Sequence, residues 1–293
     1  MKLRGSMVAI VTPLKGGKPD LAALRDLVEW QVAEGTEGIV PCGTTGEGAT
    51  LTAGEREDVI RAVVETVRGR VTVIAGAGSN STAEAIEGVR LAKEVGADAA
   101  LVVTPYYNKP TQEGLFRHYM ALWDAVGFPV VAYNVPSRTA VDLLPETVAR
   151  LVQAGAIAGL KEATANMDRQ VQLVEKAGAD TIAWLSGDDF TVVPYVACGG
   201  HGVISVVANV VPRAMKELVA AALGGDFAGA LRRQVAMADL NRAMFIETNP
   251  GPVKAAVALM GRASPEIRLP LWPPSEANLA KIREALVRFG VRL

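Results

Sequence analysis

Lys161 is the residue with the clearest chemical signal, because it directly follows the apolar run 156–160. An amine in apolar surroundings is partly desolvated, which disfavours the ammonium and leaves a neutral amine able to attack a carbonyl carbon. Lys161 is therefore a candidate Schiff-base nucleophile. The ordinary alternative is a lysine at a strand end that pairs with Glu162 or reaches solvent, and this residue alone does not decide between the two.

Three further groups carry chemistry that would suit such a nucleophile. Tyr133 ends the preceding apolar run, and a phenol beside an amine can exchange protons with it, although a buried tyrosine is more often a core aromatic. The turn Gly43–Gly46 holds Thr44 and Thr45, whose hydroxyls and backbone N–H groups suit a carboxylate. Its alternative is a turn in which threonine caps the next helix. Arg138 could bind a second carboxylate in bidentate fashion, or be a solvated surface arginine.

The adjacent pair Tyr106 and Tyr107 lies in a segment between two prolines. On an extended path neighbouring side chains point to opposite sides. One ring could therefore enter this active site while the other packs against a neighbouring subunit. The alternative is a surface aromatic cluster.

The elements that must position these residues form a regular series of short apolar runs bounded by Gly, Pro, Asn or Asp. They are residues 7–11, 38–40, 71–75, 99–103, 130–133, 157–161, 182–185 and 203–206. Nearly continuous hydrophobicity is typical of parallel strands covered on both faces. With helical patterns between them, they predict an α/β fold, a closed (β/α)8 TIM barrel with the polar residues at the carboxyl ends of its strands. An open doubly wound sheet is disfavoured because no glycine-rich phosphate loop follows the first run.

The helical patterns have recognisable starts, with Asp20, Ser81 and Thr111 as N-caps. After the eighth run roughly 85 residues remain. Their patterns predict helices over 212–222, 227–245, 252–260 and 275–289. We therefore expect a barrel over residues 1–224 and a C-terminal helical region over residues 225–293.

The composition limits the remaining classes. A net charge of −1 gives no reason to expect nucleic acid or an anionic membrane surface as a partner. No apolar run approaches the ~20 residues of a membrane span, and the opening residues 1–5 break before any signal-peptide core. Two cysteines and two histidines make a disulfide framework or a His/Cys metal site improbable. We expect a cytoplasmic protein with no cofactor and no metal.

Taken together, these motifs resemble the dihydrodipicolinate synthase family of pyruvate-dependent Schiff-base lyases. The likeness runs from Gly5 to Lys254. It is densest in residues 43–47, 104–114, 133–139, 159–164 and 199–209. The resemblance implies that pyruvate condenses with aspartate semialdehyde in lysine and diaminopimelate biosynthesis, in a homotetramer built from two tight dimers.

The resemblance also assigns roles to residues. Lys161 would form the Schiff base, with Thr44, Tyr133 and a Tyr107 from the neighbouring subunit as proton relay. Thr45 and the amides of Thr44 and Thr45 would hold the pyruvate carboxylate, and Arg138 that of the semialdehyde. Gly187 and Ile204 would line the pyruvate pocket, mainly through backbone.

Two alternatives remain open within and beyond the family. A related aldolase for sugar acids, of the 2-keto-3-deoxygluconate or N-acetylneuraminate type, would need several hydroxyl-binding groups, and some such aldolases retain an arginine-containing version of the loop at Arg138. A non-catalytic small-molecule sensor on the same barrel would have no need of Lys161, Tyr133, Thr44 and Tyr107 together.

Regulated members of the family bind lysine at the tight-dimer interface. The residue types used there are matched by Ala49, Asn80, Glu84 and Tyr106. Ala53 and Arg56 stand where some lysine-sensitive members carry histidines, and Gly48 where a serine can occur. We therefore predict weak or absent inhibition by lysine.

Overall fold

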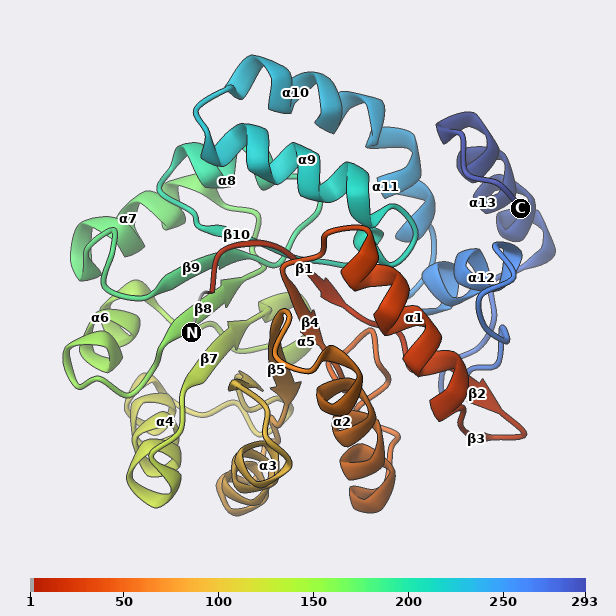
Figure 1. Cartoon of the computed structure of the whole chain (residues 1–293). Coiled ribbons are helices and arrows are strands. Elements are labelled where there is room, and N and C mark those ends of the chain that lie inside the picture. Colours follow the sequence, from red (N-terminus) through yellow and green to blue (C-terminus); the bar gives the residue numbers. More distant parts are fainter. Residues whose placement is uncertain (1–2) are drawn as a thin grey trace.

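The structure is a computed structural model that describes residues 3–293, so Met1 and Lys2, part of the signal-peptide and domain predictions, lie outside the described residues. Within that range eight parallel strands close into a barrel in the order β1-β10-β9-β8-β7-β6-β5-β4. The prediction of a (β/α)8 barrel is confirmed, and Figure 1 shows the strands at the centre of a ring of helices. The strands are β1 (Gly5–Ala9), β4 (Gly38–Val40), β5 (Thr72–Gly76), β6 (Ala99–Val103), β7 (Val130–Asn134), β8 (Gly159–Glu162), β9 (Ala183–Ser186) and β10 (Gly202–Ser205).

The surrounding helices begin where the sequence places their polar caps. Asp20, Ser81 and Thr111 each accept a hydrogen bond from a backbone N–H of the first turn, as predicted. The ring consists of α1 (Leu21–Ala33), α2 (Ala53–Val67), α3 (Thr82–Val95), α4 (Gln112–Val126), α6 (Pro145–Gln153), α7 (Met167–Ala177), α8 (Val192–Ala197) and α9 (Pro212–Leu223).

Apolar side chains form two layers, one on each side of the strands. The larger layer lies between strands and helices, and a smaller cluster fills the barrel interior with residues such as Met7, Leu101 and Leu185. Tyr133 and Ile204 belong to this inner cluster. Burial on both faces explains why the strands read as continuous hydrophobic runs.

The C-terminal region differs in one respect from the sequence prediction. The helix expected over 227–245 is broken at Met237 into α10 (Phe227–Ala236) and α11 (Ala238–Met244). Gln234 and Asn241, on either side of the break, both donate a side-chain N–H to the backbone oxygen of Asp189. Helices α12 (Gly251–Leu259) and α13 (Glu276–Phe289) follow and pack against each other beside α1 (Figure 1).

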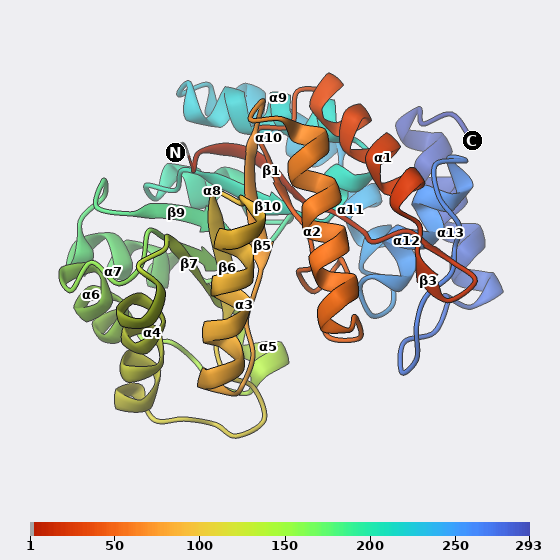
Figure 2. The ribbon, with the colours of Figure 1, turned by 60° about the horizontal axis from the view of Figure 1, so that its bottom comes forward.

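Several short elements were not predicted. The hairpin β2 (Leu14–Lys15) and β3 (Lys18–Pro19) follows β1, and the one-turn helix α5 (Pro136–Thr139) follows β7. Helix α8 has only six residues, too few for a periodic pattern. In Figure 2 helix α5 lies at the same end of the barrel as the long loop after β6. Within residues 3–293 no helix is both long and apolar enough to cross a membrane.

Candidate active site

Lys161 lies in β8 and is buried, with 6% of its surface exposed. Its Nζ atom is 4.3 Å from the ring centroid of Tyr133, which is its register neighbour in β7. Glu162, the predicted alternative partner, forms an ion pair with Arg169 at 2.8 Å instead. Burial lowers the pKa of Lys161 to about 8; the Asp189 carboxylate opposes this shift and the Arg138 charge adds to it. A substantial fraction of the amine is therefore neutral near physiological pH.

Tyr133 is nearly as buried as the lysine and lies at the end of β7. Burial raises the pKa of its phenol, while the Arg138 charge and a hydrogen bond with Thr44 lower it. Thr44, Tyr133 and Lys161 form a series of neighbouring groups, in which the Thr44 side chain affects the pKa of the phenol and the ring centroid lies 4.3 Å from the amine. Such a series can pass protons to and from a group bound at the amine.

The turn that carries Thr44 and Thr45 has the properties of a carboxylate cradle. Among residues 3–293 neither amide N–H finds a hydrogen-bond acceptor, so both are free to donate. Cys42 and Glu47 flank the turn with positive φ angles of 56° and 55°, strained values for residues other than glycine. The cap of α2 is Thr52. The alternative reading, in which Thr44 or Thr45 caps that helix, is therefore wrong.

Residues from the C-terminal region brace this turn, which sequence reasoning did not predict. The side-chain amide of Asn249 donates to the hydroxyl of Thr45 at 3.1 Å. Lys254 forms a fully buried ion pair with Glu47, and the backbone N–H of Arg268 donates to the same carboxylate at 2.9 Å. The only sequence signal was that the family resemblance extends as far as Lys254, which says nothing of the partner of this residue.

Gly187 and Ile204 complete the barrel interior around Lys161. A Cβ atom on Gly187 would lie 3.1 Å from Cε of Lys161 and 2.8 Å from Cβ of Ala163, so the backbone approaches the lysine as only glycine allows. Ile204 is buried in the inner cluster. The sequence analysis did not single out Asp189, whose charge affects the pKa of Lys161. Burial raises the pKa of Asp189 to about 6, and its Oδ2 accepts from the N–H groups of Val206 and Val207.

Arg138 lies on α5 and is exposed at the barrel mouth. Within the described residues its guanidinium makes no hydrogen bond or ion pair, yet its charge affects the pKa of both Tyr133 and Lys161. A free guanidinium near the amine can bind a carboxylate on an incoming molecule.

Tyr107 is highly exposed, with 88% of its surface accessible. It lies in the loop after β6 and has a φ angle of 71°, which is strained for a non-glycine residue. Tyr106 is 38% exposed. The structure thus brings the other site residues together in one chain but leaves Tyr107 on the surface.

The residues that match the binding site for an inhibitory lysine molecule form two local groups. Ser79 donates to Glu84 at 2.8 Å, and Asn108 donates to the backbone oxygen of Asn80 at 2.9 Å, which places the Tyr106 loop beside Asn80. In the second group, Arg56 donates to the backbone oxygen of Gly48 at 3.1 Å, next to the exposed Ala49. A Cβ on Gly48 would lie 2.1 Å from the oxygen of Cys42, so a serine would require the turn to shift.

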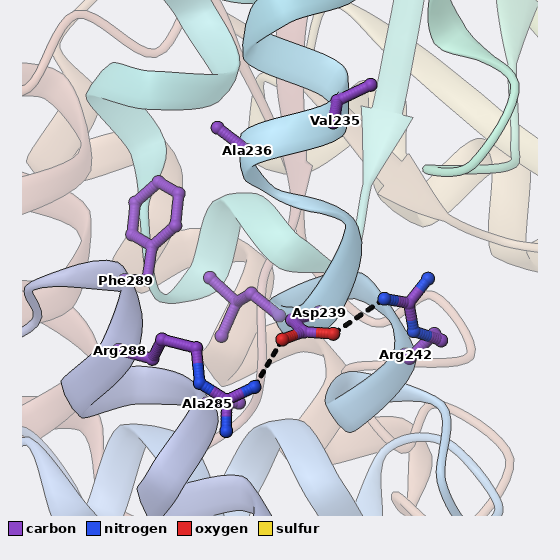
Figure 3. A pocket seen from close by; sticks show the side chains of 8 residues that line it. Val235, Ala236, Asp239, Arg242, Ala285, Arg288 and Phe289 are labelled. Carbon is purple, nitrogen blue, oxygen red and sulfur yellow. Dashed lines mark hydrogen bonds and ion pairs between the residues drawn. The ribbon is translucent and has the colours of Figure 1, made fainter.

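A surface hollow of about 420 Å³ lies between α10, α11 and α13, and none of the predicted site residues line it (Figure 3). Its Asp239 forms ion pairs with Arg242 and Arg288, and all three side chains are largely exposed. Solvent screens such pairs strongly. Among residues 3–293 no three His, Cys, Asp or Glu side chains gather as a metal site.

Comparison with known proteins gives a consistent result. The sequence model of the dihydrodipicolinate synthetase family matches residues 2–288. A 4-hydroxy-tetrahydrodipicolinate synthase from Anaeromyxobacter dehalogenans (strain 2CP-C) is 78% identical over 292 residues, covering 100% of this chain and 99% of the relative.

Two solved structures have nearly the same fold. The dihydrodipicolinate synthase of Aquifex aeolicus superposes with a TM-score of 0.97 at 47% identity, covering 99% of both chains. The chloride-inhibited enzyme of Acinetobacter baumannii, solved with pyruvate, gives 0.97 at 46% identity, covering 99% of this chain and 100% of that one.

Proposed function

Since the chain belongs to the dihydrodipicolinate synthetase family, we propose that it condenses pyruvate with L-aspartate 4-semialdehyde through a Schiff base on Lys161. The product is 4-hydroxy-tetrahydrodipicolinate, on the route to diaminopimelate and lysine. The observation that carries the proposal is the buried Lys161 amine inside the barrel, 4.3 Å from the Tyr133 ring and with a pKa lowered to about 8.

The chemistry follows from a neutral amine next to a phenol. Lys161 attacks the pyruvate carbonyl and, after loss of water, forms a protonated imine. The iminium withdraws electrons from the methyl group, whose proton leaves to give an enamine carbon nucleophile. The enamine adds to the semialdehyde's aldehyde, and the amine of that substrate displaces Lys161 by transimination as the ring closes.

Protons in these steps pass along Thr44, Tyr133 and Tyr107. The Thr44 side chain lowers the pKa of Tyr133, and this coupling supports the first part of the relay. The pyruvate carboxylate binds to the hydroxyl of Thr45 and the free amides of Thr44 and Thr45, with Gly187 and Ile204 lining the pocket. Arg138 binds the carboxylate of the semialdehyde.

Tyr107 reaches the relay of another subunit rather than its own. Its exposure and its strained backbone support this role, because strain of this kind persists at functional sites. The assembly is a homotetramer built from two tight dimers, and the protein acts in the cytoplasm. We also propose that residues 1–224 form the barrel domain and residues 225–293 a C-terminal helical region.

A comparison of aldehyde substrates tests the proposed function. With pyruvate fixed, the purified enzyme is given either aspartate semialdehyde or the aldehydes of sugar-acid aldolases, and loss of pyruvate is followed. Turnover of aspartate semialdehyde alone supports the proposal. A preference for the sugar aldehydes would assign the chain to the related aldolases, and turnover of neither would favour the sensor.

A further inference from the structure

A buried polar network lies behind β8, on the opposite side of the strand from the Lys161 amine. Its centre is Arg169 on α7, a residue with 7% of its surface exposed. Arg169 Nε donates to Glu162 at 2.8 Å, its NH1 donates to Asp142 at 3.0 Å, and its NH2 donates to the backbone oxygen of Leu143. All three nitrogens of this guanidinium therefore have acceptors.

Asn134 joins the same network from the end of β7. Its Nδ2 donates to Asp142 at 2.8 Å and to Glu162 at 3.1 Å, and its Oδ1 accepts from the N–H of Leu143 at 3.0 Å. The network therefore holds residue 134 on one side and residues 142–143 on the other. The segment between these two anchors is the loop that carries Arg138.

Within that loop the backbone is tightly wound. The N–H groups of Arg138 and Thr139 both donate to the oxygen of Val135, at 2.9 and 3.1 Å. The exposed Arg138 side chain has no partner of its own among residues 3–293, so its position depends on the backbone beneath it. That backbone depends in turn on the two anchors.

We propose that Arg169, with Asp142, Asn134 and Glu162, positions Arg138 for the carboxylate of the second substrate. This rests on the role given to Arg138 under the proposed function. These are positioning residues, because none of their side chains forms a hydrogen bond or ion pair with Arg138, Lys161 or Tyr133 within residues 3–293. Glu162 and Lys161 are neighbours in β8 with opposite directions, so one strand sets both the nucleophile and the anchor of the loop.

Asp142→Asn is the most informative variant, because this side chain is 38% exposed and the Glu162–Arg169 pair stays intact. The new amide keeps one acceptor oxygen but presents an N–H donor to either Asn134 or Arg169, so one of these two hydrogen bonds is lost. We expect kcat/KM for aspartate semialdehyde to fall on the order of tenfold, as for a displaced binding group. Trapping of the pyruvate imine with borohydride should keep its half-saturating pyruvate concentration. Arg169→Lys, which keeps the charge but loses the fork, should act in the same direction.

A double-mutant cycle separates positioning from general destabilisation. In an Arg138→Ala background, Asp142→Asn should cost nothing further. Glu113→Gln, which disrupts an exposed ion-pair cluster between α4 and α6, is the matched control and should leave kcat/KM unchanged in both backgrounds. Full and independent losses from Asp142→Asn and Arg138→Ala would overturn the inference alone. An Arg138→Ala variant with normal kcat/KM for the semialdehyde would overturn both the role of Arg138 and this inference.

Discussion

The floor and the rim of the active site are built differently. At the floor, Lys161, Tyr133 and Thr45 are at most 7% exposed, and each is in contact with another residue of the site or its braces. At the rim, Arg138 and Tyr107 are exposed, and the polar groups of their side chains make no hydrogen bond or ion pair within residues 3–293. The floor is therefore organised by one folded chain, whereas the rim is completed by substrate and, as proposed, by a second subunit.

Because of this difference, variants of the two regions should affect different steps, namely imine formation with pyruvate at the floor and use of the semialdehyde at the rim. Changes at the floor alter burial and buried charges, which affects both folding and imine formation. Changes at the rim remove single charge-assisted contacts and leave the fold intact. Variants of the two regions should consequently differ in stability as well as in the substrate that they affect.

The largest effect is expected from Lys254→Met, which removes one partner of the buried pair with Glu47 below the Thr44–Thr45 turn. An unpaired buried carboxylate destabilises a protein by about 3–5 kcal/mol. Urea denaturation should show that loss in the free energy of unfolding. The double variant Glu47→Gln, Lys254→Met should recover most of it. A single variant as stable as the parent would show that the pair does not brace the floor.

Arg138→Ala tests the rim. Loss of a charge-assisted hydrogen bond costs about 1.5–3 kcal/mol, or roughly ten- to a hundredfold in kcat/KM for the semialdehyde. Pyruvate imine formation should change far less. Arg117→Ala removes an exposed arginine from α4 and serves as the control. Equal losses in both half-reactions would contradict the assignment of Arg138 to the second carboxylate.

How far the sequence predicts this molecule depends on the range of each interaction. The barrel and the helix starts at Asp20, Ser81 and Thr111 follow from local hydrophobic patterns and caps. The pairing of Glu47 with Lys254 joins positions 207 residues apart, so no local pattern reports it. The contacts of Tyr107 cannot be predicted from within one chain, because its proposed partner lies in another subunit.

The pH dependence of imine formation tests whether burial at the floor lowers the pKa of Lys161. Only the neutral amine attacks, and burial lowers the pKa of Lys161 to about 8. The initial trapping rate should therefore fall about tenfold per pH unit below about pH 8 and level off above it. If burial did not shift the pKa of Lys161, borohydride trapping at a series of pH values would instead show a midpoint near the ordinary pKa of 10.5.

The smallest effect is expected from lysine. Arg56 stands beside Gly48 in the predicted effector region, and its positive charge would repel the ammonium group of lysine. Titration of lysine into the assay at near-saturating pyruvate should show weak or no inhibition. Strong inhibition at sub-millimolar lysine would show that Asn80, Glu84 and Tyr106 suffice for regulation.

The central claim is that Lys161 is the nucleophile, and intact-mass measurement after borohydride reduction with pyruvate tests it most directly. The parent protein and Lys176→Ala, a surface lysine variant, should each gain one reduced pyruvate adduct. Lys161→Ala should gain none, and Lys161→Arg should also fail because a guanidinium stays protonated and cannot attack a carbonyl. A Lys161→Ala protein that still gains the adduct would contradict the account.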